Sequence, residues 1–102
     1  MMEDWSDRRS GPRRPLISFV PIRIGPHSGR LLDTSDIGLR FELDAPAGAE
    51  LRAATTVFLG RSSTAVPITV VWTSHEGDGP WICGALVAEH GRADWHAFLA
   101  TV

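Results

Sequence analysis

Apolar and polar residues alternate along much of the chain with the period of a β-strand. The clearest case is 38–43, in which the apolar residues fall on one face and Arg40 and Glu42 on the other. Further strands are predicted by apolar runs bounded by turn-forming residues, over 16–24, 30–34, 50–59, 65–74 and 81–89. The pattern therefore predicts about six strands.

The stretch 65–74 keeps this alternation to its end. Its regular period predicts that Trp72 lies on the same face as Val66, Ile68 and Val70. We therefore expect Trp72 on the apolar face of this strand.

Short strands with turns between them, and no helical period among them, are typical of an all-β sandwich or barrel. A barrel is favoured because it leaves no strand edge exposed. The end of the chain differs, since Asp94 can cap a short helix over 93–101. One apolar stripe of this helix would pack against the barrel or close its end, and comprises Trp95, Phe98, Leu99 and Val102.

The first 15 residues are polar and interrupted by Gly11, Pro12 and Pro15, which predicts a flexible arm. The rest, 16–102, is predicted to form one domain, because 102 residues suffice for a single modest core. No apolar run approaches the length of a membrane span and no secretory signal is recognisable, so we expect a cytoplasmic protein.

Charge is distributed unevenly, although the net charge is only −2. The first 30 residues hold six of the ten cationic residues, all of them arginines: Arg8, Arg9, Arg13, Arg14, Arg23 and Arg30. Arginine suits planar, bidentate contacts to phosphate or guanine. The arm is therefore either a solvated basic segment or a ligand-binding one.

Catalytic and metal-binding patterns are not apparent. The four histidines lack metal-ligand spacing, no serine lies in a nucleophile elbow, and no phosphate-binding glycine loop is present. Cys83 is expected to be an ordinary buried thiol. We predict a binding protein that is not an enzyme and has no cofactor.

Two short motifs remain. The first is Arg9-x-x-x-Arg13 in the arm, and the second is Asp33-x-Ser35-x-x-Gly38 between two strands. A structural explanation exists for each: a solvated arm, and a tight turn in which Asp33 and Ser35 bond local N–H groups while Gly38 takes a positive φ.

In this order and separation the two motifs resemble those of the PilZ domain, the receptor module for the second messenger cyclic di-GMP. The start of the third strand, Gly38 to Phe41, and the late strand with an internal glycine, 81–86, are also similar to that family. The resemblance covers about residues 8–99. It implies a six-stranded antiparallel β-barrel of the split-barrel type, with the flexible arm at its N-terminus and the short helix at its C-terminus.

The resemblance also implies the ligand and its contacts. Arg9 and Arg13 would bind phosphate and the acceptor edge of guanine, and Asp33 would accept hydrogen bonds from the donor edge. Ser35 would add a hydroxyl contact and Gly38 would leave room for the nucleotide. Arg8 and Arg14 could substitute for their neighbours Arg9 and Arg13, so the register of the arginine pair is open.

In the PilZ family the arm folds over the ligand, which implies a reader that signals to a downstream protein by ordering of its arm. The first alternative is a PilZ-like protein–protein adaptor that has lost nucleotide binding. The second is a small barrel that binds single-stranded nucleic acid, which the acidic body disfavours. The sequence does not identify the downstream protein.

Overall fold

The computed structural model describes residues 13–16, 18–44, 54–75 and 77–102. Within them the chain forms seven strands and two helical segments. In chain order these are β1 (Arg14–Pro15), β2 (Pro21–Ile24), β3 (His27–Thr34), β4 (Gly38–Leu43), β5 (Ala54–Leu59), β6 (Thr64–Ser74), β7 (Trp81–Val87), the 3₁₀ turn η2 (Glu89–Gly91) and α2 (Arg92–Leu99).

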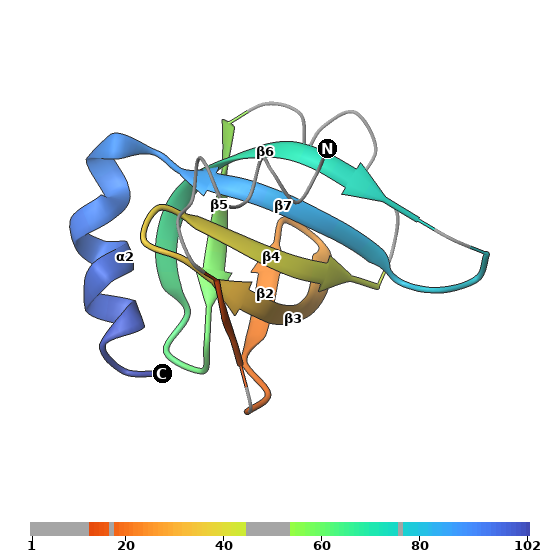
Figure 1. Ribbon diagram of the computed structural model, residues 1–102, viewed down its shortest axis with the longest axis horizontal. Helices are drawn as coiled ribbons and strands as arrows, with labels where there is room; N and C mark the ends of the chain where they lie inside the picture. Colours follow the sequence, from red (N-terminus) through yellow and green to blue (C-terminus); the bar gives the residue numbers. More distant parts are fainter. Residues whose placement is uncertain (1–12, 17, 45–53, 76) are drawn as a thin grey trace.

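Six of these strands close into an antiparallel barrel (Figure 1). The hydrogen-bonded order is β3-β2-β5-β6-β7-β4, and pairing of β4 with β3 completes the circle. Strand β1 lies outside it and pairs with the end of β3, with Arg14 opposite Thr34. The predicted six-stranded barrel with a C-terminal helix is confirmed.

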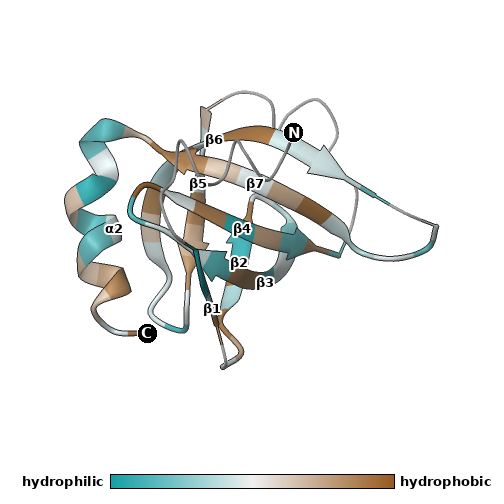
Figure 2. Ribbon diagram, viewed as in Figure 1, coloured by the Kyte–Doolittle hydropathy of each residue, from teal (hydrophilic) through white to brown (hydrophobic). Residues whose placement is uncertain are grey.

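The barrel is filled by the inward side chains of its strands, as the alternation predicted. In β4, for example, Leu39, Phe41 and Leu43 are fully buried. Apolar residues recur along β4 and β7 in Figure 2, whereas β1 is hydrophilic. The core therefore lies inside the barrel, and polar chemistry is confined to its outer face and rims.

Helix α2 packs along one side of the barrel (Figure 1). Trp95 is fully buried and Phe98 is nearly so, which confirms the predicted apolar stripe, although Val102 lies beyond the helix and is exposed. The predicted cap is wrong. The helix starts at Arg92 with Gly91 as its N-cap and without a side-chain cap, so Asp94 lies inside the first turn.

Several predicted boundaries shift. Strand β2 begins at Pro21 and not at residue 16, and the turn to β3 contains only Gly25, with φ +56°, and Pro26. Glycine accepts this left-handed conformation without the steric cost that other residues incur, which allows so tight a turn. The predicted strand 50–59 is described only from Ala54.

The predicted arm, 1–15, lies mostly outside the described residues. Its last part is not separate from the barrel, because Arg14 and Pro15 form β1 on the edge of β3. Within the described ranges, no helix is long and apolar enough to cross a membrane.

Candidate functional site

A β-bulge in β3 determines where Asp33 points. Leu31 pairs with Phe41, but the next paired residue is Asp33, opposite Arg40, so that Leu32 is an extra residue in the ladder. In a regular strand Asp33 would share the core face with Leu31. The extra residue shifts the phase by one and places Asp33 beside Arg40, on the outer face of β4.

Two arginines hold the carboxylate of Asp33. Arg13 donates from Nη1 to Oδ1 at 2.9 Å, and Nη2 of Arg40 lies 2.5 Å from Oδ2. The Asp33 side chain is only 6% exposed, against 13% for Arg13 and 43% for Arg40. Two positive charges surround one buried negative charge, so the cluster carries a net charge of +1 and favours an anionic partner.

The Arg13–Asp33 contact joins the two sequence motifs. The residues are 20 positions apart, and their contact brings the arginine motif to the Asp-x-Ser-x-x-Gly motif. Arg8 and Arg9 lie outside the described residues. The sequence-predicted Arg14 is close by in β1, where its side chain is exposed.

A second bulge, in β6, moves Trp72. Val70 pairs with Ala85 and Trp72 with Gly84, which leaves Val71 as the extra residue, 41% exposed. The prediction that Trp72 lies on the face of Val66, Ile68 and Val70 is therefore wrong. Its ring instead covers Gly84 on the outer face, where a Cβ on residue 84 would collide with the indole.

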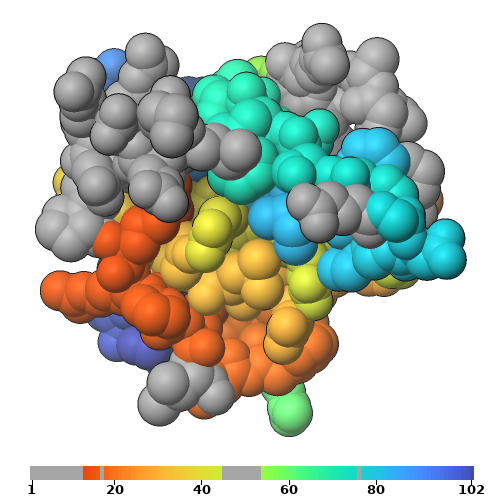
Figure 3. Space-filling view, turned by 45° about the vertical axis from the view of Figure 1, so that its right-hand side comes forward, coloured from red at the N-terminus to blue at the C-terminus, as the bar shows by residue number. Residues whose placement is uncertain are grey.

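The two bulges together align four residues across four neighbouring strands. Asp33 of β3 lies opposite Arg40 of β4, Arg40 opposite Gly84 of β7, and Gly84 opposite Trp72 of β6. Figure 3 shows these strands side by side on one face, with β3 in orange, β4 in yellow, β7 in blue and β6 in teal. This row combines a carboxylate, a guanidinium and a flat aromatic ring.

The row could be predicted only in part. The motif indicates Asp33, but an outward arginine on an alternating strand normally indicates a solvated face, so the sequence gives no sign that Arg40 belongs to the row. The glycine in the late strand was the one available signal for a close approach, because glycine in a strand interior often marks one.

Ser35 and Gly38 hold the turn between β3 and β4. The backbone N–H of Ser35 donates to the carbonyl of Gly38 at 2.9 Å, and its hydroxyl donates to the same oxygen at 3.3 Å. Ser35 is 4% exposed. Gly38 starts β4 without a positive φ, so the left-handed conformation expected for it is wrong. Their role as ligand contacts stays a prediction.

Helix α2 secures the same turn from the other side. Nε1 of Trp95 donates to the carbonyls of Ser35 and Asp36 at 3.2 and 3.1 Å. Nε2 of His96 lies 2.9 Å from the carbonyl of Asp36 and 3.1 Å from its carboxylate Oδ1. The motif turn is thus fixed to the C-terminal helix by side chains on two successive residues.

A hollow of about 740 Å³ lies between β1, this turn and the end of α2. Its size is within the range usual for small-molecule sites. It adjoins the motif through Thr34 and Ser35, and is lined by Arg14, Pro15, Leu16, Ser18, Val20, Thr34, Ser35, Asp36, Leu99, Thr101 and Val102.

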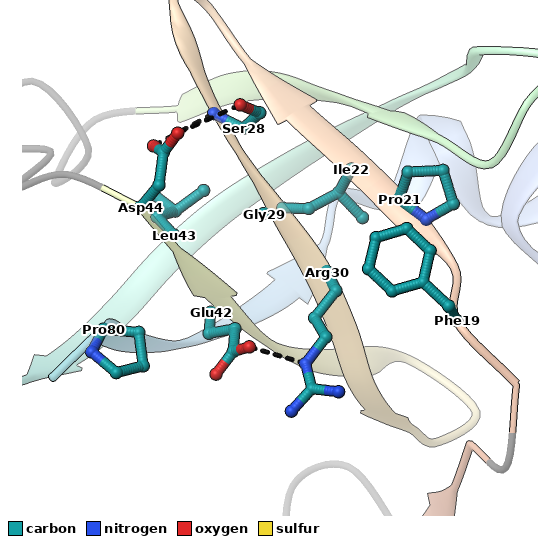
Figure 4. Close-up of a pocket in the computed structure, with 10 residues that line it drawn as sticks. All are labelled: Phe19, Pro21, Ile22, Ser28, Gly29, Arg30, Glu42, Leu43, Asp44 and Pro80. Carbon is teal, nitrogen blue, oxygen red and sulfur yellow. Dashed lines mark hydrogen bonds and ion pairs between the residues drawn. The ribbon is translucent and has the colours of Figure 1, made fainter.

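A second, mostly apolar hollow of about 440 Å³ lies over β2, β3 and β4 (Figure 4). Phe19, 70% exposed, stands at its edge with Pro21. The Arg30–Glu42 ion pair, at 2.5 Å, crosses another side of it. Its lining offers apolar contact rather than convergent polar groups.

Groups suited to metal binding or nucleophilic chemistry do not gather in the described parts of the chain. No group of three or more His, Cys, Asp or Glu residues there could hold a metal ion. Burial raises the pKa of the Cys83 thiol to about 11, which disfavours the reactive thiolate.

Comparison of the chain with protein-family models, with curated proteins and with solved structures gave no significant match.

Proposed function

We propose that this protein is a PilZ-type receptor for cyclic di-GMP, and that it acts by binding and not by catalysis. The observation that carries the proposal is the contact of Arg13 with Asp33, since it joins the arginine motif to the Asp-x-Ser-x-x-Gly motif on the outside of a six-stranded barrel.

The ligand's chemistry matches the row of residues described above. Its two phosphates need cations, which Arg13 supplies together with Arg9 or its neighbours Arg8 and Arg14. Each guanine has a donor edge that suits the carboxylate of Asp33. The ring of Trp72 offers a flat apolar surface on which a base can stack.

Ser35 and Gly38 contribute mainly by shape. The turn that they form presents Asp33 at the end of β3, next to the hollow that Arg14 lines. In this proposal the basic N-terminal segment closes over the nucleotide, and the closed form is recognised by a downstream protein.

Calorimetric titration of the purified protein with cyclic di-GMP tests the proposal, with GTP and cyclic di-AMP as controls. Saturable binding of cyclic di-GMP that exceeds binding of both controls supports a receptor. Absence of heat at high micromolar nucleotide refutes it.

An adaptor without nucleotide binding is the second candidate. It is favoured by Phe19, because an aromatic side chain 70% exposed beside an apolar hollow is typical of a protein-contact surface. The two candidates differ in the titration: an adaptor gives no heat with cyclic di-GMP.

A further inference from the structure

The two arginines on Asp33 are anchored to the protein very differently. Arg13 precedes β1, a strand of two residues outside the barrel. Arg40 lies in the interior of β4, which is hydrogen-bonded to β3 on one side and to β7 on the other. Displacement of a short edge segment can therefore carry Arg13, backbone included, away from Asp33, whereas the backbone of Arg40 is held in the barrel wall on both sides.

The guanidinium group of Arg13 also resembles one part of the proposed ligand. The donor edge of guanine, N1–H and the exocyclic NH₂, is a guanidine fragment, and the side chain of arginine is a guanidinium group. The bond from Nη1 of Arg13 to Oδ1 of Asp33 is thus of the same kind as the bond that guanine would make there.

The carboxylate is too buried to hold Arg13, Arg40 and a guanine edge at once. Its side chain is 6% exposed, and each oxygen already has an arginine within hydrogen-bond distance. Because so little of the carboxylate is exposed, we expect a guanine that reaches Asp33 to replace one of the two arginines. The difference in anchoring makes Arg13 the partner that is replaced.

Arg40 then becomes essential for a specific reason. A buried carboxylate without a cationic partner is strongly unfavourable, so Asp33 can exchange Arg13 for a neutral base only if a second cation stays in place. We propose that Arg40 is a positioning residue that pairs with Asp33 throughout, while Arg13 exchanges with guanine and moves to a phosphate. This inference rests on the proposed function.

Arg30 provides a matched control for Arg40. It lies in β3 beside β4, forms an ion pair of the same 2.5 Å length with Glu42, and is similarly exposed, at 51%. Its partner is not Asp33. Arg30→Ala therefore removes an arginine and an ion pair from the same outer face without affecting the proposed exchange.

The experiment is calorimetry with cyclic di-GMP on the unmodified protein, Arg40→Ala, Arg40→Lys and Arg30→Ala, with thermal unfolding of each. We expect Arg40→Ala to weaken binding about tenfold or more, the effect of one charge-assisted hydrogen bond. Arg40→Lys should restore most of the affinity, because it keeps the charge, and Arg30→Ala should bind as the unmodified protein does.

Side-chain ¹⁵N–¹H NMR of the arginine Nε groups tests the exchange directly, with Arg13→Lys and Arg40→Lys used to assign the two signals. On addition of cyclic di-GMP the Arg13 signal should shift strongly and the Arg40 signal little.

The results of these experiments distinguish the positioning role of Arg40 from the receptor proposal. If the unmodified protein binds cyclic di-GMP but Arg40→Ala binds equally well, or Arg13 does not shift, the positioning role is wrong and the receptor stands. If the unmodified protein does not bind, the receptor proposal fails, and the exchange fails with it.

Discussion

The indole of Trp72 occupies the space above Gly84 that a side chain at position 84 would need. Gly84→Ala should therefore push the ring away and lower the free energy of unfolding by about 1–3 kcal/mol, as overpacking does. Urea denaturation measures the loss.

A double-mutant cycle identifies the cause of that loss. In a Trp72→Ala background the collision is absent, so Gly84→Ala should cost much less than it does in the unmodified protein. If Gly84→Ala lowered the free energy of unfolding equally in the two backgrounds, the cause would be a contact other than the one with the indole.

Arg13 and Asp33 should differ in how they affect nucleotide binding. Arg13→Ala should weaken binding of cyclic di-GMP and flatten its salt dependence, because one phosphate contact is lost. Asp33→Ala should cost about 1–3 kcal/mol and reduce the preference over cyclic di-AMP, while the salt dependence stays steep. Titrations at several salt concentrations distinguish the two, with Arg61→Ala as an exposed-arginine control. The same response from both variants would contradict this division.

Trp95 should stabilise the motif turn through its indole N–H. Trp95→Phe removes the bonds to the carbonyls of Ser35 and Asp36 and should cost about 1–3 kcal/mol, with faster amide hydrogen exchange in the turn. Trp81→Phe is the control, because Trp81 stacks on His75 at the opposite end of β7. Unchanged exchange rates in the turn after Trp95→Phe would show that the helix does not support it.

Cys83 should dominate the alkaline pH dependence of stability. The chain contains no tyrosine, and all ten of its Lys and Arg residues are arginines, so no other side chain titrates between about pH 9 and 11. Burial raises the pKa of Cys83 from 9.0 to about 11, so the folded state holds the proton more tightly than the unfolded state does. The contribution of this thiol to the free energy of unfolding is fully present below about pH 9. It is lost as pH rises toward 11, and the total loss is about 3 kcal/mol.

Chemical denaturation at a series of pH values checks this decline. Cys83→Ala should give a stability that is lower at neutral pH but nearly constant from pH 9 to 11. A decline of equal size in that variant would place its origin elsewhere.

The sequence was sufficient to predict the barrel because burial imposes a period of two. The alternation in 38–43 shows which side chains of β4 face the core, and the apolar spacing of Trp95 and Phe98 shows the buried side of the helix. These positions are dictated by hydrophobic burial, which is directly visible in the order of residues.

The geometry of the site could not be predicted in this way, since a bulge leaves no mark on the hydrophobic pattern. Leu32 and Val71 resemble ordinary strand residues, yet each shifts the phase of the residues that follow. Asp33 was recognised only through its motif. Arg40 and Trp72 belong to no motif, and only the register across four strands brings them together.

Closure of the barrel through β4 and β7 has a kinetic consequence. These strands are far apart in the sequence, because residues 38–43 pair with residues 81–86 and residues 44–80 lie between them. Contacts so distant in sequence form slowly, after local hairpins such as that of β2 and β3. Arg40 meets Gly84 only when this seam closes, and we expect a nascent or partly folded chain to be unable to bind nucleotide until its last strand pairing is complete.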